Sequence, residues 1–261
     1  ILSETEDKVG SQLAIVKEVF NGTPSSPSGY SLADSQTSDV NGIPTRRFRF
    51  LKNNVVLSES KDKVGSQLSI VKEVFNGTPS AISGYSIANE RESNVDGIPT
   101  KQFTFLKNNV QLSQSEDKVG SQLAISQQWF NPSEDKTVSG YSLASQNTSD
   151  FEGIKTIEYR FLKEDVQLSQ SEDEVGSQNS ITEEWFKPSA SRKTKTNYSL
   201  ARKDESNVQG IPTERYTFLK DNVVLSVSED RVGSQLAITN EVFKPDDDAF
   251  GGKNISGVAL S

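Results

Sequence analysis

The sequence VGSQLAIVKEVF, at residues 9–20, decides the architecture because it returns almost letter for letter along the chain. Its opening Val-Gly-Ser-Gln begins at Val9, Val64, Val119, Val175 and Val232, which spaces the copies 55, 55, 56 and 57 residues apart. Such self-similarity is the signature of a tandem repeat. The predicted divisions are the end of a preceding repeat at 1–8, repeats at 9–63, 64–118, 119–174 and 175–231, and a partial fifth repeat at 232–261.

Each repeat is predicted to hold four β-strands, because apolar and polar residues alternate in four segments. In the first repeat these segments lie at 11–20, from 30 onward, at 45–51 and at 55–60. Turn sequences such as Asn41-Gly42 separate them, and no helical period appears. The expected fold class is all-β, a tandem array of about 55-residue four-stranded antiparallel, β-sandwich-like modules. β-propeller blades are the alternative, because a blade also has four strands.

All variation in repeat length lies between the first and second strands. Phe20 and Tyr30 are 10 residues apart, whereas Phe186 and Tyr198 are 12 apart. A connection that tolerates insertions is expected to face solvent and to make contacts. The candidate contact residues on the copies of this loop are Asn21, Thr23, Asn76, Thr78, Glu134, Lys136, Arg192, Lys193, Lys195, Asp246, Asp247 and Asp248.

The glycosylation sequon is matched at Asn21-Gly22-Thr23 and Asn76-Gly77-Thr78 on this loop, and further matches begin at Asn147, Asn197 and Asn254. Turn chemistry explains the same letters, because Asn-Gly suits a backbone with positive φ. Acidic pairs such as Glu6-Asp7 recur near the repeat boundaries and offer oxygen ligands for calcium, although no complete calcium-loop pattern accompanies them. Sequon use and calcium binding therefore stay open.

Composition narrows the function classes. The formal net charge of -8 argues against a nucleic-acid partner, and no apolar run approaches the ~18 residues of a membrane helix. The chain contains no His and no Cys, so the commonest general base and metal ligand is missing. An enzyme concentrates its special residues once, whereas here each notable motif recurs. We expect no catalytic residues, no cofactor and no enzymatic activity.

The repeats are expected to depend on neighbours for stability. About thirteen apolar positions recur in each repeat of roughly 55 residues, and no disulfide supports them. No linker separates one repeat from the next. Stability is predicted to come from adjacent repeats and from other chains, in a homo-oligomer or with other proteins of an assembly.

The repeat resembles tandem repeats in structural proteins of tailed bacteriophages, of the kind found in marine environmental sequences. The matching residues are VGSQLAIVKEVFNGTP at 9–24, SGYSLA at 28–33, GIPT at 42–45 and FRFLK at 48–52. Two copies depart from the pattern, where Lys155 replaces the proline and Val258 replaces the tyrosine. The resemblance covers every repeat and implies a component of a virion rather than a catalyst.

These observations lead to one expected function and one alternative. The expected function is a non-enzymatic structural protein of a bacteriophage particle: a fibre, tail or surface-decorating component. It would act as a stiff spacer with variable contact loops, located in a virion or at an extracellular surface. The alternative is a bacterial cell-surface adhesin whose variable loops bind host-surface glycans or protein.

Overall fold

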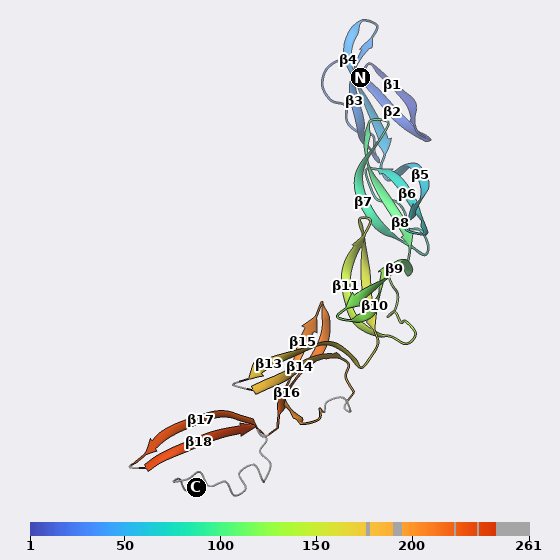
Figure 1. The fold of residues 1–261 in the computed structure, drawn as a ribbon. Coiled ribbons are helices and arrows are strands. Elements are labelled where there is room, and N and C mark those ends of the chain that lie inside the picture. Colours follow the sequence, from blue (N-terminus) through green and yellow to red (C-terminus); the bar gives the residue numbers. More distant parts are fainter. Residues whose placement is uncertain (176–177, 190–194, 222, 234, 244–261) are drawn as a thin grey trace. The chain divides into compact units, whose positions relative to one another are not determined.

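The computed structural model describes residues 1–175, 178–189, 195–221, 223–233 and 235–243, and every regular element in this part is a β-strand (Figure 1). The strands form four sheets of four strands, which we call modules 1 to 4, and one hairpin. The all-β prediction and the predicted tandem array of four-stranded antiparallel modules are therefore confirmed. Module 1 contains β1 (Ser3–Val9), β2 (Gln12–Val19), β3 (Tyr30–Val40) and β4 (Ile43–Lys52).

The later modules repeat this pattern of strand lengths. Module 2 contains β5 (Val55–Val64), β6 (Gln67–Phe75), β7 (Tyr85–Val95) and β8 (Ile98–Lys107). Module 3 contains β9 (Val110–Val119), β10 (Gln122–Phe130), β11 (Ser142–Phe151) and β12 (Ile154–Leu162). Module 4 contains β13 (Val166–Val175), β14 (Gln178–Phe186), β15 (Tyr198–Val208) and β16 (Ile211–Lys220), and the hairpin contains β17 (Val223–Val232) and β18 (Gln235–Phe243).

Each module is a single sheet whose strand order departs from chain order. In module 1 the order is β1-β2-β4-β3, and the other modules keep the equivalent order. The pairs are antiparallel, with Val9 opposite Gln12, Ala14 opposite Leu51, and Val40 opposite Ile43. The first hairpin closes through Gly10, whose φ of 60° supplies the positive value that a two-residue hairpin turn needs.

The sheets are out of phase with the repeats counted from Val9. Strand β5 begins at Val55, inside the first predicted repeat, yet it pairs with β6 along its whole length, from Val55 opposite Phe75 to Val64 opposite Gln67. The fourth strand of each predicted repeat is thus the first strand of the following sheet. The tight turn that joins β5 to β6 makes them a hairpin, and this pairing sets where a module starts.

One face of modules 1, 2 and 4 carries a buried aromatic cluster. In module 1, Phe48 and Phe50 lie two residues apart on β4 and are buried with Val19, against the partly buried Ile15 and Tyr30. Equivalent clusters centre on Phe103 and Phe105 in module 2, and on Trp185, Tyr216 and Phe218 in module 4. In module 2 the cluster also takes Ile82 from the variable loop, so part of that loop folds back onto the sheet.

The chain divides into two compact units. The first comprises Ile1–Gln114, Gln127–Asp135 and Asn147–Glu158, and so holds modules 1 and 2 with one end of module 3. The second comprises Ser115–Ser126, Lys136–Gln146 and Tyr159–Ser261, and holds the other end of module 3 and module 4.

Candidate contact surface at the module junctions

Consecutive modules meet through an apolar junction built from two small sets of side chains. At the first junction, module 1 supplies a receiving set, Val9, Ala14, Ala33 and Leu51, and module 2 supplies an inserted set, Leu57, Phe75 and Ile98. All seven side chains are buried in one cluster. The two alanines leave room on the receiving side, and the phenylalanine and isoleucine fill the junction.

The same arrangement recurs at the next two junctions. Within the first compact unit, Leu106 of module 2 packs with Leu112, Phe130 and Ile154 of module 3, with Val64 and Ala88 partly buried against them. Within the second unit, Val119, Ala124, Ala144 and Leu162 of module 3 pack with Leu168, Phe186 and Ile211 of module 4. Burial of this kind stabilises by ~1.5–3 kcal/mol per large apolar side chain, so the junctions are a main source of cohesion.

The turn glycines let these surfaces approach. A Cβ atom on Gly120 would lie 2.3 Å from the carbonyl oxygen of Leu168, and one on Gly65 would lie 3.1 Å from that of Leu112. Both glycines also have positive φ, at 59° and 58°. At Gly65 and Gly120 the Val-Gly turn therefore needs glycine twice, for its backbone conformation and for contact with the next module.

An asparagine clamp lies beside the apolar junction. The side chain of Asn76 donates from Nδ2 to Ser31 Oγ and to Asn53 Oδ1, at 2.7 Å each. The backbone carbonyl oxygen of Asn76 accepts a hydrogen bond from the backbone N–H of Asn54 at 3.3 Å. In turn, Asn54 Oδ1 accepts a hydrogen bond from the backbone N–H of Thr78 at 3.1 Å. Asn76 adopts a φ of 44°, which agrees with the turn interpretation of its Asn-Gly pair.

The second and third junctions keep this clamp, with one change of chemistry. At the second, Asn131 Nδ2 donates to Asn108 Oδ1 at 2.8 Å and to Ser86 Oγ at 3.3 Å. At the third, the asparagine pair is replaced by an ion pair between Lys187 and Glu164 at 3.1 Å. Ser142, the counterpart of Ser86, donates to Glu164 at 2.6 Å. Hydrogen bonds from Ser142 and then Lys187 lower the pKa of Glu164.

Open grooves accompany the first two junctions at equivalent places. The first, of about 520 Å³, is lined by the apolar Leu32 and Phe75 together with Asn76, Thr78 and Lys101. The second, also about 520 Å³, is lined by their counterparts Ile87, Phe130 and Asn131 with Thr148 and Lys155. Each groove combines an apolar floor with amide, hydroxyl and ammonium groups at its rim.

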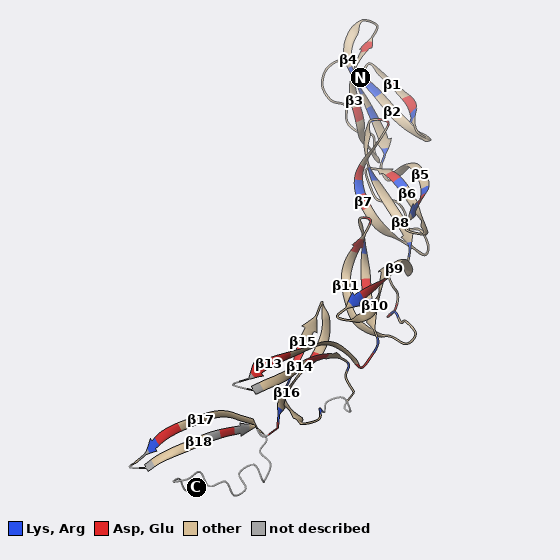
Figure 2. Cartoon of the chain, viewed as in Figure 1, with Lys and Arg blue, Asp and Glu red and all other residues tan. Residues whose placement is uncertain are grey.

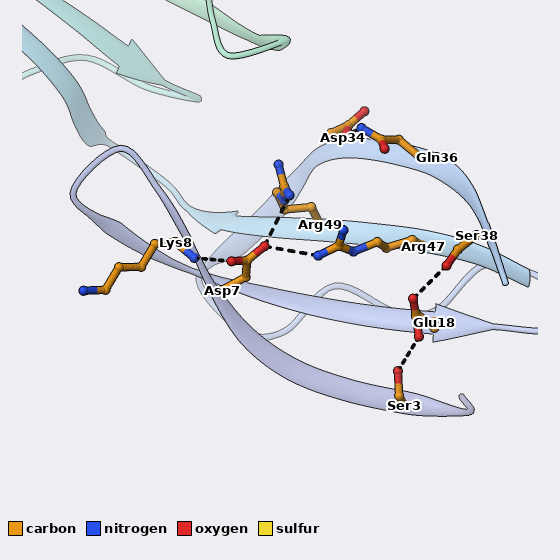
Figure 3. Close-up of polar contacts among 9 residues, drawn as sticks. All are labelled: Ser3, Asp7, Lys8, Glu18, Asp34, Gln36, Ser38, Arg47 and Arg49. Carbon is orange, nitrogen blue, oxygen red and sulfur yellow. Dashed lines mark hydrogen bonds and ion pairs between the residues drawn. The ribbon is translucent and has the colours of Figure 1, made fainter. Parts of the chain in front are cut away.

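The face opposite the aromatic clusters carries a polar network. Glu18 accepts hydrogen bonds from Ser3 and Ser38 at 2.8 Å each, which lower its pKa (Figure 3). The backbone N–H of Lys8 and then the charges of Arg49 and Arg47 lower the pKa of Asp7 (Figure 3). A lowered pKa makes both carboxylates weaker bases, which suits a structural role more than proton transfer.

The same network recurs in modules 3 and 4. Gln128 takes the glutamate position in module 3, between Ser113 and Ser149 at 2.7 and 2.9 Å. In module 4 the glutamate is Glu184. Burial alone would raise its pKa, but hydrogen bonds from Ser206, Arg215 and Ser169 outweigh burial, and the pKa lies below its usual value.

The predicted contact residues divide into three groups. Asn21, Thr23, Asn76, Thr78 and Glu134 are exposed, although the amide of Asn76 is engaged in the clamp. Lys136 is buried, and Lys195 is half-buried, with its ammonium 2.5 Å from the buried carboxylate of Glu183. Lys195 thus holds the loop of module 4 to its own sheet. Arg192, Lys193, Asp246, Asp247 and Asp248 lie outside the described residues.

Sequence reasoning missed the residues on the other side of the clamp. The sequence pattern indicated only a strand start at Ser31 and a turn at Asn53 and Asn54. The signal that could have found them is covariation between copies, because Asn53 and Asn76 become Glu164 and Lys187 together.

Charges of both signs are interspersed over the modules (Figure 2). Several basic side chains are paired with carboxylates, for example Arg47 with Asp7 at 3.1 Å and Lys101 with Glu90 at 2.7 Å. Within the described ranges, no three His, Cys, Asp or Glu side chains come together as metal ligands. The part of the chain that the structure describes also contains no helix long and apolar enough to cross a membrane.

Fold and junctions together define a tandem array of single-sheet β-modules. Comparisons of the chain with protein-family models, with curated proteins and with solved structures find no match.

Proposed function

We propose that this protein is a non-enzymatic structural component of a bacteriophage particle, such as a fibre, tail or surface-decorating protein, and that it acts as a stiff spacer. The observation that carries the structural role is the repeated junction, in which similar apolar sets pack together three times. The ground for placing it in a phage is the resemblance of its repeat to structural repeats of tailed phages.

The mechanism is mechanical. A buried apolar junction resists bending, because separating the two sets would return Phe75, Ile98 and their neighbours to water. The clamp adds directional hydrogen bonds that fix how one module turns on the next. The variable loops then present different side chains at a regular spacing along the array.

Detection in purified particles tests this proposal. Antibodies raised against module 2 should label intact virions from the source of the gene, and mass spectrometry should find the repeat among virion proteins. Absence from purified particles, together with presence on bacterial cells, would exclude the phage assignment.

A second candidate is a bacterial cell-surface adhesin. The specific observation that favours it is the pair of equivalent grooves, whose apolar floors and polar rims are suited to sugar rings and their hydroxyl groups. A glycan array probed with the full chain tests this candidate. Binding that is lost in Lys101→Ala and kept in the exposed control Lys52→Ala would favour the adhesin.

A further inference from the structure

Module 1 exposes the same side chains that the later modules bury in their junctions. The inserted set of module 2 consists of Leu57, Phe75 and Ile98, which are 8%, 4% and 0% exposed. Their counterparts in module 1 are Leu2, Phe20 and Ile43, which are 47%, 64% and 41% exposed. We call these three residues of module 1 its end surface.

Part of the end surface has the same local geometry as a buried inserted set. Ile43 begins β4 opposite Val40, as Ile98 begins β8 opposite Val95. Phe20 directly follows the last residue of β2, whereas Phe75 is the last residue of β6. The backbone therefore already holds Ile43 as it holds Ile98, while Phe20 lies just beyond the strand end.

Polar groups beside the end surface also repeat the junction. Asn21 follows Phe20 as the clamp residue Asn76 follows Phe75. At the first junction Asn76 donates to a serine and an asparagine of module 1. Asn21 is exposed and stands at the same place beside the end surface.

We infer that the end surface is a docking site for one further module of this same repeat. The occupant would present a receiving set of the Val-Ala-Ala-Leu type, as module 1 does to module 2. Asn21 would then donate to the serine and turn asparagine of that module. The first two junctions show that this pairing of surfaces is buried and hydrogen-bonded, and it holds whether or not the protein belongs to a phage particle.

Cysteine labelling can test the docking, because the chain contains no cysteine. The probe is the full chain with a second copy of residues 55–110 fused directly before Ile1, which reproduces the spacing found between modules 2 and 3. In the chain without the added copy, Ile43→Cys should react fast with a maleimide and Ile98→Cys slowly. In the extended chain, labelling at Ile43→Cys should slow by about tenfold or more, toward the Ile98→Cys rate.

A matched variant separates docking from nonspecific shielding. Ala88→Arg placed only in the added copy puts a long charged side chain into its receiving set, and it should restore fast labelling at Ile43→Cys. Unchanged labelling in an extended chain whose added strands are visible by circular dichroism would overturn the inference. A second probe carries residues 110–166 in the same place before Ile1. If both added copies stayed unfolded, the inference would also be overturned, because docking should stabilise them.

Discussion

Lys187 forms an ion pair with Glu164 at the position where Asn131 meets Asn108 one junction earlier. Both sides of the contact have changed together, from two neutral amides to two opposite charges. The serine that supports the pair, Ser86 or Ser142, is kept. The junction therefore preserves a cross-module contact while its chemistry varies.

This exchange predicts a difference in salt sensitivity. The double variant Glu164→Asn with Lys187→Asn should restore the neutral clamp, so the melting temperature of module 4 should respond less to sodium chloride than in the original chain. Fluorescence of Trp185, which is buried in module 4, can follow melting at low and at 1 M salt. Lys187→Asn alone should destabilise the junction. An equal salt response in the original chain and the double variant would contradict an electrostatic clamp.

Asn76→Ala should weaken the first junction by about 1 kcal/mol or more, because Ser31 and Asn53 each lose a hydrogen-bond donor. Hydrogen exchange at the backbone amides of Asn54 and Thr78 measures this local opening. The matched control is Asn21→Ala, at the same repeat position in module 1, where the change in stability should stay within about ±0.5 kcal/mol. Equal effects of the two variants would show that the clamp hydrogen bonds do not stabilise the junction.

Phenylalanines at equivalent positions should differ sharply in their contribution to the free energy of unfolding. Phe75→Ala leaves a cavity in a buried junction and should lower this free energy by about 3–5 kcal/mol. Phe20→Ala removes a largely exposed ring and should cost far less. Hydrogen exchange resolved by module is the suitable measurement, because an array of modules need not unfold in one step. If Phe20→Ala opened module 1 as much as Phe75→Ala opens the first junction, the junction would not be the main source of cohesion.

Acid should weaken module 4 through Glu184. The pKa of Glu184 is lower in the folded state than in the unfolded state. The stability that Glu184 contributes is therefore present above the unfolded pKa and is lost as the pH falls through the folded pKa. Glu184→Gln should be less stable than the original chain at pH 7, because the ion pair with Arg215 is gone, and this difference should narrow below about pH 4.5. Denaturant titrations at pH 7 and pH 3, followed by Trp185 fluorescence, compare the two chains.

Gln128 provides the internal comparison for that experiment. It holds the same place between two serines in module 3 without a titrating group. A Gln128→Glu variant should give module 3 some of the acid sensitivity of module 4. A stability gap between Glu184→Gln and the original chain that stays constant from pH 7 to pH 3 would show that Glu184 does not contribute through its charge.

The repeat period and the strand pattern could be predicted because they depend on letters that recur in every copy. Strand alternation places Leu13 on the same face as Ile15 and Val19, yet Leu13 is 53% exposed. It pairs with Lys8 near the hairpin tip, one residue before the pairing of β2 with β4 begins at Ala14, so no third strand lies beside it.

Burial at the junctions could not be predicted from one repeat alone. Phe20 and Phe75 have the same letters around them, yet Phe75 is buried against module 1 and Phe20 is 64% exposed. The loop lysines show a similar limit. Lys136 and Lys195 were predicted as contact residues because their loop varies in length, whereas burial and the partner Glu183 depend on how the loop folds back. Whether the exposed loop residues contact a partner stays a prediction.

Because the three described junctions bury similar apolar sets, the order of the modules is interchangeable at the level of apolar packing. Recombination between the nearly identical gene segments that encode Val9–Phe20 and its copies would delete or duplicate one whole period. Each remaining receiving set would still meet an inserted set, and only the clamp would change, for example where Lys187 came to lie beside Asn108 instead of Glu164. The length of the protein can therefore change by whole modules.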